Sequence, residues 1–345
     1  MLEETVFINN EEIITFVKDI YGLDITNIER INRGSANLYS LNNDLYVLKE
    51  FQSDYSEKEI INEIAIINHL KKDDIPVPTY IKTKNNEFYF IYKERLIIIQ
   101  EFIDGYTLEN NEGNLKQTLE CADLYGRIIK SLETLEIELP SFDISEWYNE
   151  VSFNDAISKH EKLISLLDDT NENHKKIKSD LEDKLKMIES IKDKDYSNMS
   201  NLTIKNTHGD YSLIQFIYKD DKVNAVIDFV SACKMPIVWE IIRSYSYIDN
   251  DIKNGEFNLD HLVEYVKTVN KHISLNKYDL EYMPYVYLLQ LLNSTYGYKQ
   301  YINDPRKENL LAFGYLRTNI CKYLYKNADI ISKRLSEEIN GSYYE

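Results

Sequence analysis

The sequence predicts an α+β protein with two lobes, a small β-rich lobe followed by a larger, mostly helical one. Short runs rich in β-branched and aromatic residues occur up to about residue 103, whereas longer segments with apolar residues at helical spacing dominate beyond it. The turn pair Asp104-Gly105 lies between the β-rich part and the helical part of the sequence. We therefore expect an N-terminal lobe over residues 1–103 and a C-terminal lobe over residues 104–345.

In the N-terminal lobe, residues 11–21 carry an apolar stripe at helical spacing, and Gly22 ends this predicted helix. A second amphipathic helix is predicted over residues 57–70. The segment Ile75-Pro76-Val77-Pro78 ends it, because proline disfavours helix both at its own position and at the residue before it. The β-like runs of this lobe lie at residues 28–32, 37–42, 45–51, 88–92 and 95–103.

The predicted C-terminal lobe is mostly helical but contains a pair of strands. These strands are expected over residues 214–218 and 223–229, joined by the turn Lys219-Asp220-Asp221-Lys222. Apolar residues at helical spacing predict helices at residues 115–135, 154–167, 171–192, 259–271, 280–300 and 308–339. A loop beside the strand pair can present a side chain for chemistry while the strands stay rigid.

Composition and charge argue against several classes of partner. Lysine and arginine number 40 and aspartate and glutamate 58, giving a net charge of −18 without a basic stripe, so we expect no nucleic-acid partner. The longest apolar run, Leu96 to Ile99, is too short to span a bilayer, and the acidic start, Met1 to Glu4, is no signal peptide. Widely spaced cysteines fit reduced thiols without a structural zinc site; they are Cys121, Cys233 and Cys321. We therefore expect a cytoplasmic protein without a membrane partner.

The most informative motif is Thr207-His208-Gly209-Asp210, because an amide and a second carboxylate follow it at defined distances. Gln215 comes five residues after Asp210, and Asp228 comes 18 residues after it, within Val226-Ile227-Asp228-Phe229. In a kinase, one carboxylate orients and deprotonates the acceptor hydroxyl, while an amide and a second carboxylate hold Mg²⁺ on the nucleotide phosphates. A Gly-Asp pair alone is a common turn, but this combination indicates a kinase.

This order and spacing resemble the aminoglycoside phosphotransferase family, whose signature is His-Gly-Asp, four residues, Asn, and then Ile-Asp-Phe. The resemblance spans roughly residues 30–245 and implies a bilobal protein-kinase-like fold. It also implies transfer of a phosphoryl group from ATP or GTP, with Mg²⁺, to a hydroxyl of a small molecule. Asp210 would be the catalytic base, and Gln215 and Asp228 would be the metal ligands. Gln215 replaces the family's Asn and lengthens the arm by one methylene, although Mg²⁺ tolerates little departure from octahedral geometry.

The resemblance also identifies residues that would position the nucleotide phosphates. Lys49, in the run Val47-Leu48-Lys49, would grip the phosphates, and Glu63 on the following helix would hold the lysine. Glu59, four residues earlier on the same face, is the competing candidate. Outside this order, a strand lysine and a helix glutamate are usually surface charges that contribute little stability.

Three further positions complete the predicted nucleotide site, and a fourth supports it. Ser35, in the turn after Arg33-Gly34, would bind phosphate oxygens, and backbone groups near Glu101 and Ile103 would bind adenine. Glu240 lies 12 residues after Asp228, where the family has an acidic residue that opens a helix. We expect Glu240 to play a structural role.

Two alternatives remain open at this point. A nucleotide-binding pseudokinase or a spore-coat-type structural protein on the same fold is favoured by Gln215. A protein kinase is disfavoured, because the sequence lacks H-R-D and has Asp228-Phe229-Val230 in place of D-F-G.

The acceptor is predicted to bind among the C-terminal helices as a small hydroxylated molecule. Acidic clusters and several tyrosines give a slight preference for a cationic acceptor, because carboxylates and aromatic faces both attract ammonium groups. These clusters are Asp168-Asp169, Asp249 to Asp251 and Glu337-Glu338.

Overall fold

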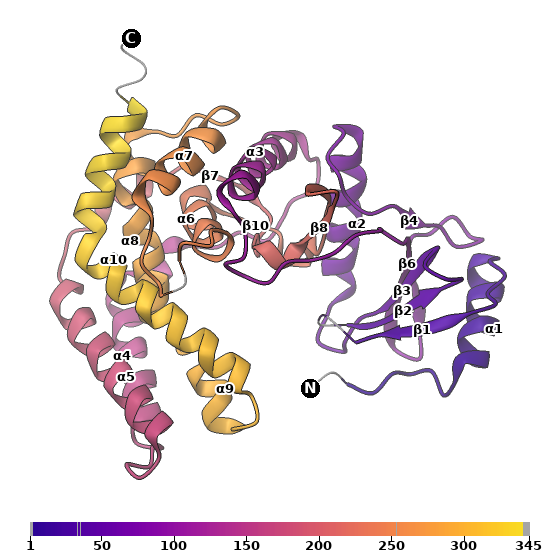
Figure 1. The fold of residues 1–345 in the computed structure, drawn as a ribbon, viewed down its shortest axis with the longest axis horizontal. Coiled ribbons are helices and arrows are strands. Elements are labelled where there is room, and N and C mark those ends of the chain that lie inside the picture. Colours follow the sequence, from indigo (N-terminus) through magenta and orange to yellow (C-terminus); the bar gives the residue numbers. More distant parts are fainter. Residues whose placement is uncertain (1–2, 33, 35, 253, 341–345) are drawn as a thin grey trace.

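The computed structural model describes residues 3–32, 34, 36–252 and 254–340, and it places a sheet-containing lobe beside a helical lobe (Figure 1). The predicted α+β class is confirmed, since the first part of the chain holds a six-stranded sheet and most of the rest is helical. The lobe boundary between residues 103 and 104 stays a prediction.

An antiparallel sheet with the order β1-β2-β3-β6-β4 forms the centre of the N-terminal lobe, and β5 pairs with β6. Helix α1 (Asn10–Tyr21) ends at Gly22, whose positive φ of 74° lets its N–H donate to the Lys18 carbonyl. Helix α2 (Glu57–Lys72) begins with a capping box. The strands are β1 (Ile28–Ile31), β2 (Asn37–Leu41), β3 (Tyr46–Glu50), β4 (Tyr80–Ile81), β5 (Phe90–Tyr92) and β6 (Arg95–Glu101).

Strand β6 is buried on both faces, which explains its continuous apolar run. Ile97 and Ile99 pack in a cluster with residues of α1, whereas Leu96 and Ile98 belong to a second cluster that includes α2 and extends into the C-terminal lobe. Successive side chains of a strand point to opposite faces. Because Lys49 of β3 is the register partner of Ile98, its side chain lies on the α2 face of the sheet.

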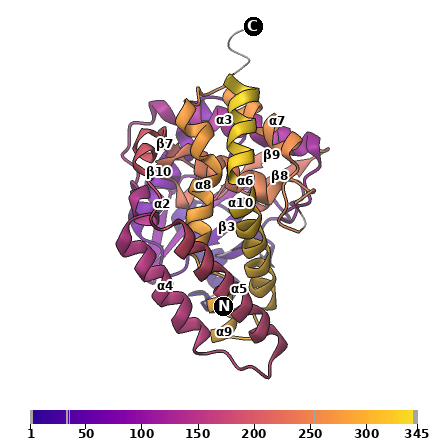
Figure 2. The same ribbon diagram turned by 90° about the vertical axis from the view of Figure 1, so that its left-hand side faces the viewer.

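The C-terminal lobe surrounds two small antiparallel sheets with helices. Strand β7 (Ile204–Thr207) pairs with β10 (Cys233–Pro236), and β8 (Phe216–Lys219) pairs with β9 (Lys222–Val226). Helices α8 and α10 lie side by side, as do α4 and α5 (Figures 1 and 2). The helices are α3 (Leu115–Ser131), α4 (Glu150–Ile164), α5 (Glu172–Ile191), α6 (Ile237–Ile248), α7 (Leu259–Asn270), α8 (Lys277–Asn293), α9 (Tyr298–Asn303) and α10 (Glu308–Asn340).

The structure differs from the predicted elements at several places, and strands β4, β7 and β10 are among the elements that were not predicted. Helix α6 was not among the helices predicted from apolar spacing, although the resemblance implied a helix opening at Glu240; in the structure it is buried nearly all round. The predicted helix over 280–300 is divided at Gly297, which has a positive φ of 95°. The predicted strand over 223–229 ends at Val226, because Asp228 takes a left-handed backbone conformation.

Within the described part of the chain, no helix combines the length and the apolar character that crossing a bilayer would require.

Candidate active site

The loop that carries Asp210 lies between β7 and β8 and packs against the segment that follows Asp228. Gly209 has a positive φ of 83°, and a Cβ atom at this position would lie only 1.9 Å from the Ser231 carbonyl oxygen. Only glycine fits such a close approach of two backbones. The Asp210 N–H donates to His208 Nδ1 (3.3 Å), and His208 Nε2 lies 3.0 Å from the Ile227 carbonyl oxygen. Residues 208 to 210 are therefore fixed to the end of the β8–β9 hairpin.

Glu240 is hydrogen-bonded to the backbone of the same loop. Its fully buried carboxylate accepts hydrogen bonds from the N–H groups of His208 (2.9 Å) and Tyr211 (3.1 Å). Burial raises the pKa of Glu240, and His208 and the two backbone donors oppose that rise. The contacts agree with the structural role expected for this residue, since it touches loop backbone on both sides of Asp210.

We expect Glu240→Gln to lower both stability and turnover. The amide NH₂ would face one of the two backbone donors and leave it unsatisfied, at a cost of about 1–3 kcal/mol. Thermal denaturation and kcat measure the two effects. Glu120→Gln is a matched control, because Glu120 Oε1 also accepts from a backbone N–H, that of Val223 (2.9 Å), away from the catalytic loop. Unchanged kcat in Glu240→Gln would contradict this role.

Asp210 is held by two side chains. Arg243 Nη2 forms an ion pair with Asp210 Oδ1, and Gln215 Nε2 donates to Asp210 Oδ2 (3.2 Å). Burial alone would lower the pKa of Arg243, but Asp210 together with Tyr247, Tyr287 and Glu240 outweighs this effect and raises it, so the guanidinium stays charged. Both contacts orient the Asp210 carboxylate, of which 39% remains exposed.

Sequence reasoning missed Arg243. Its guanidinium carbon lies 5.2 Å from the ring centre of Trp239 and 5.1 Å from that of Tyr247, so two aromatic faces hold it. The available signal was spacing, because Arg243 follows Glu240 by three residues and therefore shares its face of α6. Its Nη1 atom is buried and has no hydrogen-bond partner among the described residues.

Lys49 lies between two carboxylates, one from each lobe. Its Nζ is 3.9 Å from Glu63 Oε1 and 3.7 Å from Asp228 Oδ1. Burial alone would lower the pKa of Lys49, but Glu63 and Asp228 outweigh it and raise the pKa, so the ammonium stays charged. Burial raises the pKa of Glu63, and Lys49 opposes that rise.

Glu59 does not compete for the lysine. Its carboxylate accepts from both the N–H and the hydroxyl of Ser56 (2.7 Å each) and completes the capping box of α2. The geometry therefore favours Glu63 as the partner of Lys49.

The two predicted metal ligands come from segments that are hydrogen-bonded to each other. The Gln215 carbonyl accepts from the Ile227 N–H (3.0 Å), next to Asp228. Asp228 has φ 68° and ψ 57°, a left-handed conformation that aspartate tolerates better than most residues. Because Gln215 Nε2 faces Asp210, its Oε1 remains for a metal. Amide and carboxylate oxygens are suitable Mg²⁺ ligands, so these residues fit the ion in chemistry.

One of the backbone groups predicted to bind adenine already has a hydrogen-bond partner within the protein. The Glu101 N–H donates to the Thr79 carbonyl (2.8 Å), so this donor is not available to a base. The backbone N–H and carbonyl of Ile103 make no hydrogen bond within the described part of the protein. Ser35, the predicted phosphate ligand, lies outside the described residues.

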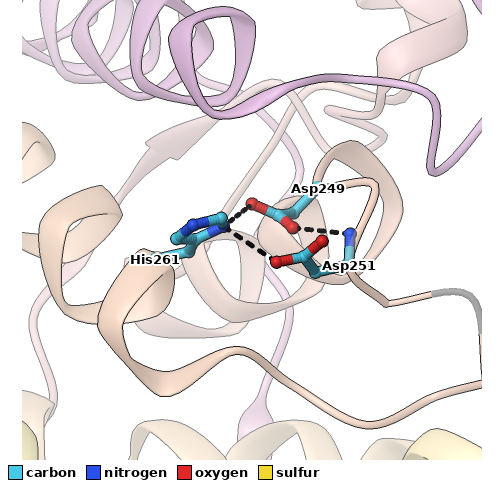
Figure 3. A group of neighbouring side chains, drawn as sticks. All are labelled: Asp249, Asp251 and His261. Carbon is cyan, nitrogen blue, oxygen red and sulfur yellow. Dashed lines mark hydrogen bonds and ion pairs between the residues drawn. The ribbon is translucent and has the colours of Figure 1, made fainter.

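A separate Asp-His-Asp group joins the end of α6 to α7 (Figure 3). His261 Nδ1 lies 2.9 Å from Asp249 Oδ2 and 3.6 Å from Asp251 Oδ2, and the Asp251 N–H donates to Asp249 Oδ1 (2.8 Å). The other predicted acidic clusters also contact basic side chains, Asp169 with Lys178 and Glu338 with Lys267. These carboxylates therefore contribute structural contacts, and the charge of the acceptor stays a prediction.

Comparison with known proteins places this geometry in a family. Residues 27–265 match the phosphotransferase enzyme family. The chain is 22% identical over 278 residues to a homoserine kinase of Zymomonas mobilis subsp. mobilis, covering 78% of this chain and 80% of that protein.

Solved structures show the same fold at low sequence identity. A spectinomycin phosphotransferase in complex with ADP and spectinomycin matches with a TM-score of 0.62 and 15% identity, covering 91% of this chain and 97% of that one. A choline/ethanolamine kinase family protein of Mesorhizobium loti matches with a TM-score of 0.59 and 13% identity, covering 97% and 99%. The likeness confirms the predicted protein-kinase-like fold. Because the family match spans more than half of the sequence, the chain belongs to the phosphotransferase enzyme family, a family of small-molecule kinases.

Proposed function

We propose that the protein is a kinase that transfers the γ-phosphoryl group of ATP or GTP, with Mg²⁺, to a hydroxyl of a small acceptor. The observation that carries this proposal is the contact between Lys49 of the sheet lobe and Asp228 of the helical lobe, at 3.7 Å. A lysine for the phosphates and a carboxylate for their metal lie side by side although 179 positions separate them. This is the arrangement that phosphoryl transfer needs.

Asp210 would act on the acceptor. Its partly exposed carboxylate can accept the hydroxyl proton while Arg243 and Gln215 keep it oriented. Lys49, steadied by Glu63, would position the nucleotide phosphates. Catalysis would come from positioning and charge neutralisation, since the transferred group needs little covalent assistance from the protein.

Gln215 and Asp228 would hold Mg²⁺, which, when bound, neutralises charge on the phosphate oxygens. The nucleotide base would bind the unpaired backbone groups of Ile103. Nucleotide binding is supported by the structural relative in complex with ADP, and a small acceptor is supported by its spectinomycin and by the homoserine kinase relative. A cytoplasmic location fits the free thiols of all three cysteines.

A coupled assay of nucleotide turnover tests the proposal. Purified protein with ATP or GTP and Mg²⁺ should release nucleoside diphosphate faster when hydroxylated acceptors are added, and mass spectrometry should detect a phosphorylated product. Nucleotide binding without any phosphorylated product would favour the alternative, a pseudokinase or coat-type scaffold. The feature in favour of that alternative is Gln215, whose amide nitrogen contacts Asp210.

We expect Gln215→Asn to change the metal requirement of the enzyme. The shorter arm would bring the amide oxygen to the position found in the family signature and would release Asp210 Oδ2 from its bond with Nε2. If the glutamine arm strains the metal site, the variant reaches half-maximal activity at a lower Mg²⁺ concentration. Asn224→Gln, an amide exchange at an exposed position of β9, is the control. A clearly higher Mg²⁺ requirement would show that the backbone has adapted to glutamine.

A further inference from the structure

Arg317 of α10 is a buried cation with only neutral partners. The residue is 8% exposed, and its Nη2 donates to Ser294 Oγ (3.0 Å) and Gln290 Oε1 (3.4 Å). It forms no ion pair with any described carboxylate, whereas Arg243 pairs with Asp210. Burying a guanidinium without a counter-charge is unfavourable. A fold that keeps such a residue often does so at a functional site.

Lys184 is a second buried cation that, like Arg317, contacts the end of α8, and its contacts explain it as a structural residue. Its Nζ donates to the Leu291 and Ser294 carbonyls (3.0 Å each) and so satisfies the C-terminal end of α8. Arg317 bonds to no backbone carbonyl there. Burial, with a smaller contribution from the nearby Arg317, lowers the pKa of Lys184 to about 8. Helix capping therefore does not explain why Arg317 is buried. The nearby positive charge of Lys184 raises the free-energy cost of burying a second cation there.

Nearby carboxylates are already engaged. Asp180 accepts from the Tyr298 hydroxyl (2.7 Å) and pairs with Lys322 (2.8 Å), which also pairs with Asp183 (2.8 Å). This leaves Arg317 in surroundings that favour a negative charge supplied from outside the protein.

A row of aromatic rings connects Arg317 to the catalytic loop. Its guanidinium carbon lies 5.7 Å from the Phe313 ring centre, and the Phe313 and Tyr247 ring centres are 5.4 Å apart. The guanidinium carbon of Arg243 lies 5.1 Å from the Tyr247 ring centre, and Arg243 pairs with Asp210.

We propose that the acceptor carries an anionic group, a carboxylate, that binds Arg317 while its hydroxyl lies at Asp210. This inference rests on the proposed function and names the class of acceptor. A guanidinium matches a carboxylate through two parallel hydrogen bonds, and Arg243, which pairs with Asp210, has an Nη1 without a hydrogen-bond partner among the described residues. This proposal differs from the slight preference for a cationic acceptor, which rested on tyrosines and on acidic clusters that contact His261, Lys178 and Lys267.

Matched acceptor pairs that differ only by the carboxylate test the inference. The pairs are L-homoserine with 3-aminopropan-1-ol, D-glycerate with ethane-1,2-diol, and 4-hydroxybutyrate with propan-1-ol. With ATP and Mg²⁺ present, we expect phosphorylated product, or failing turnover a rise in Tm, from carboxylate-bearing members only. We expect Arg317→Gln to raise KM for the active member by about 30-fold or more with a smaller change in kcat.

The variants separate binding from folding. Arg317→Gln should keep or raise the Tm of the free protein, because it removes an uncompensated buried charge, and Arg317→Lys should retain part of the affinity. Arg334→Gln is the control on the same helix, because Arg334 pairs with Asp260 at the surface. A clear loss of Tm in Arg317→Gln with unchanged KM would show a structural arginine and overturn the inference.

The remaining outcomes are also decisive. Equal turnover or stabilisation of both members of each pair, or only of the members without a carboxylate, overturns the inference and leaves the kinase intact. If nucleotide hydrolysis depends on Asp210 but no carboxylate-bearing acceptor raises Tm in an Arg317-dependent manner, the inference fails alone. If no nucleotide is bound or turned over, the proposed function fails, and the inference fails with it.

Discussion

Asp210→Asn should lower kcat by about 10²–10⁴-fold, the contribution typical of a positioned general base. The asparagine side chain has nearly the same shape and can still accept a hydrogen bond from Arg243, so the loop should keep its conformation. Nucleotide affinity should stay close to that of the wild type, because in the proposed mechanism the carboxylate acts on the acceptor and Lys49, paired with Glu63 and Asp228, acts on the phosphates. Steady-state turnover and a direct titration with nucleotide measure the two quantities.

A matched substitution controls for the loss of an ion pair. Asp104→Asn also neutralises a carboxylate, which pairs with Lys219 (2.9 Å) at the surface, and it should leave kcat unchanged. Thermal denaturation of Asp210→Asn should show a folded protein with a lower Tm than the wild type, because the largely buried Arg243 loses its counter-charge. Phosphotransfer at the wild-type rate by Asp210→Asn would refute the assignment of the catalytic base, whatever the nucleotide affinity.

The order and spacing of chemical groups along the chain made the core of the candidate site predictable from the sequence. Asp210, Gln215 and Asp228 lie on one hairpin and its flanking loop, so their spacing along the chain largely determines their separation in space. Lys49 and Glu63 were placed by their order on a strand and the next helix, and the structure brings them within 3.9 Å. Local spacing carries such predictions because strands and short helices have known lengths.

Contacts between distant segments could not be predicted in the same way. Arg243 reaches Asp210 because α6 packs against the loop that carries Asp210, and the two residues are 33 positions apart in the sequence. The choice between Glu59 and Glu63 depends on the capping box, in which Glu59 contacts Ser56 at the start of α2 and so does not pair with Lys49. Arg317 illustrates a further limit, since burial of a charge is visible only after folding.

Lys49→Met should remove most of the turnover and also destabilise the protein. Loss of one preorganised cation on the transferring phosphates typically lowers kcat by about 10²–10³-fold. The substitution also leaves Glu63, which is 1% exposed, without its counter-charge, and breaking a buried pair in this way costs about 3–5 kcal/mol. Both the rate and the free energy of unfolding should therefore fall, the first measured by phosphotransfer and the second by urea titration.

A second substitution separates these two effects. Lys49→Met combined with Glu63→Leu removes both buried charges, so it should recover much of the lost stability without recovering turnover. Glu63→Gln alone should lower turnover less than Lys49→Met, because Asp228 still holds the ammonium at 3.7 Å. Glu59→Gln should cost only about 1 kcal/mol through the cap and should leave turnover unchanged. A double variant that regains activity together with stability would show that Lys49 supports the fold and does not bind phosphate.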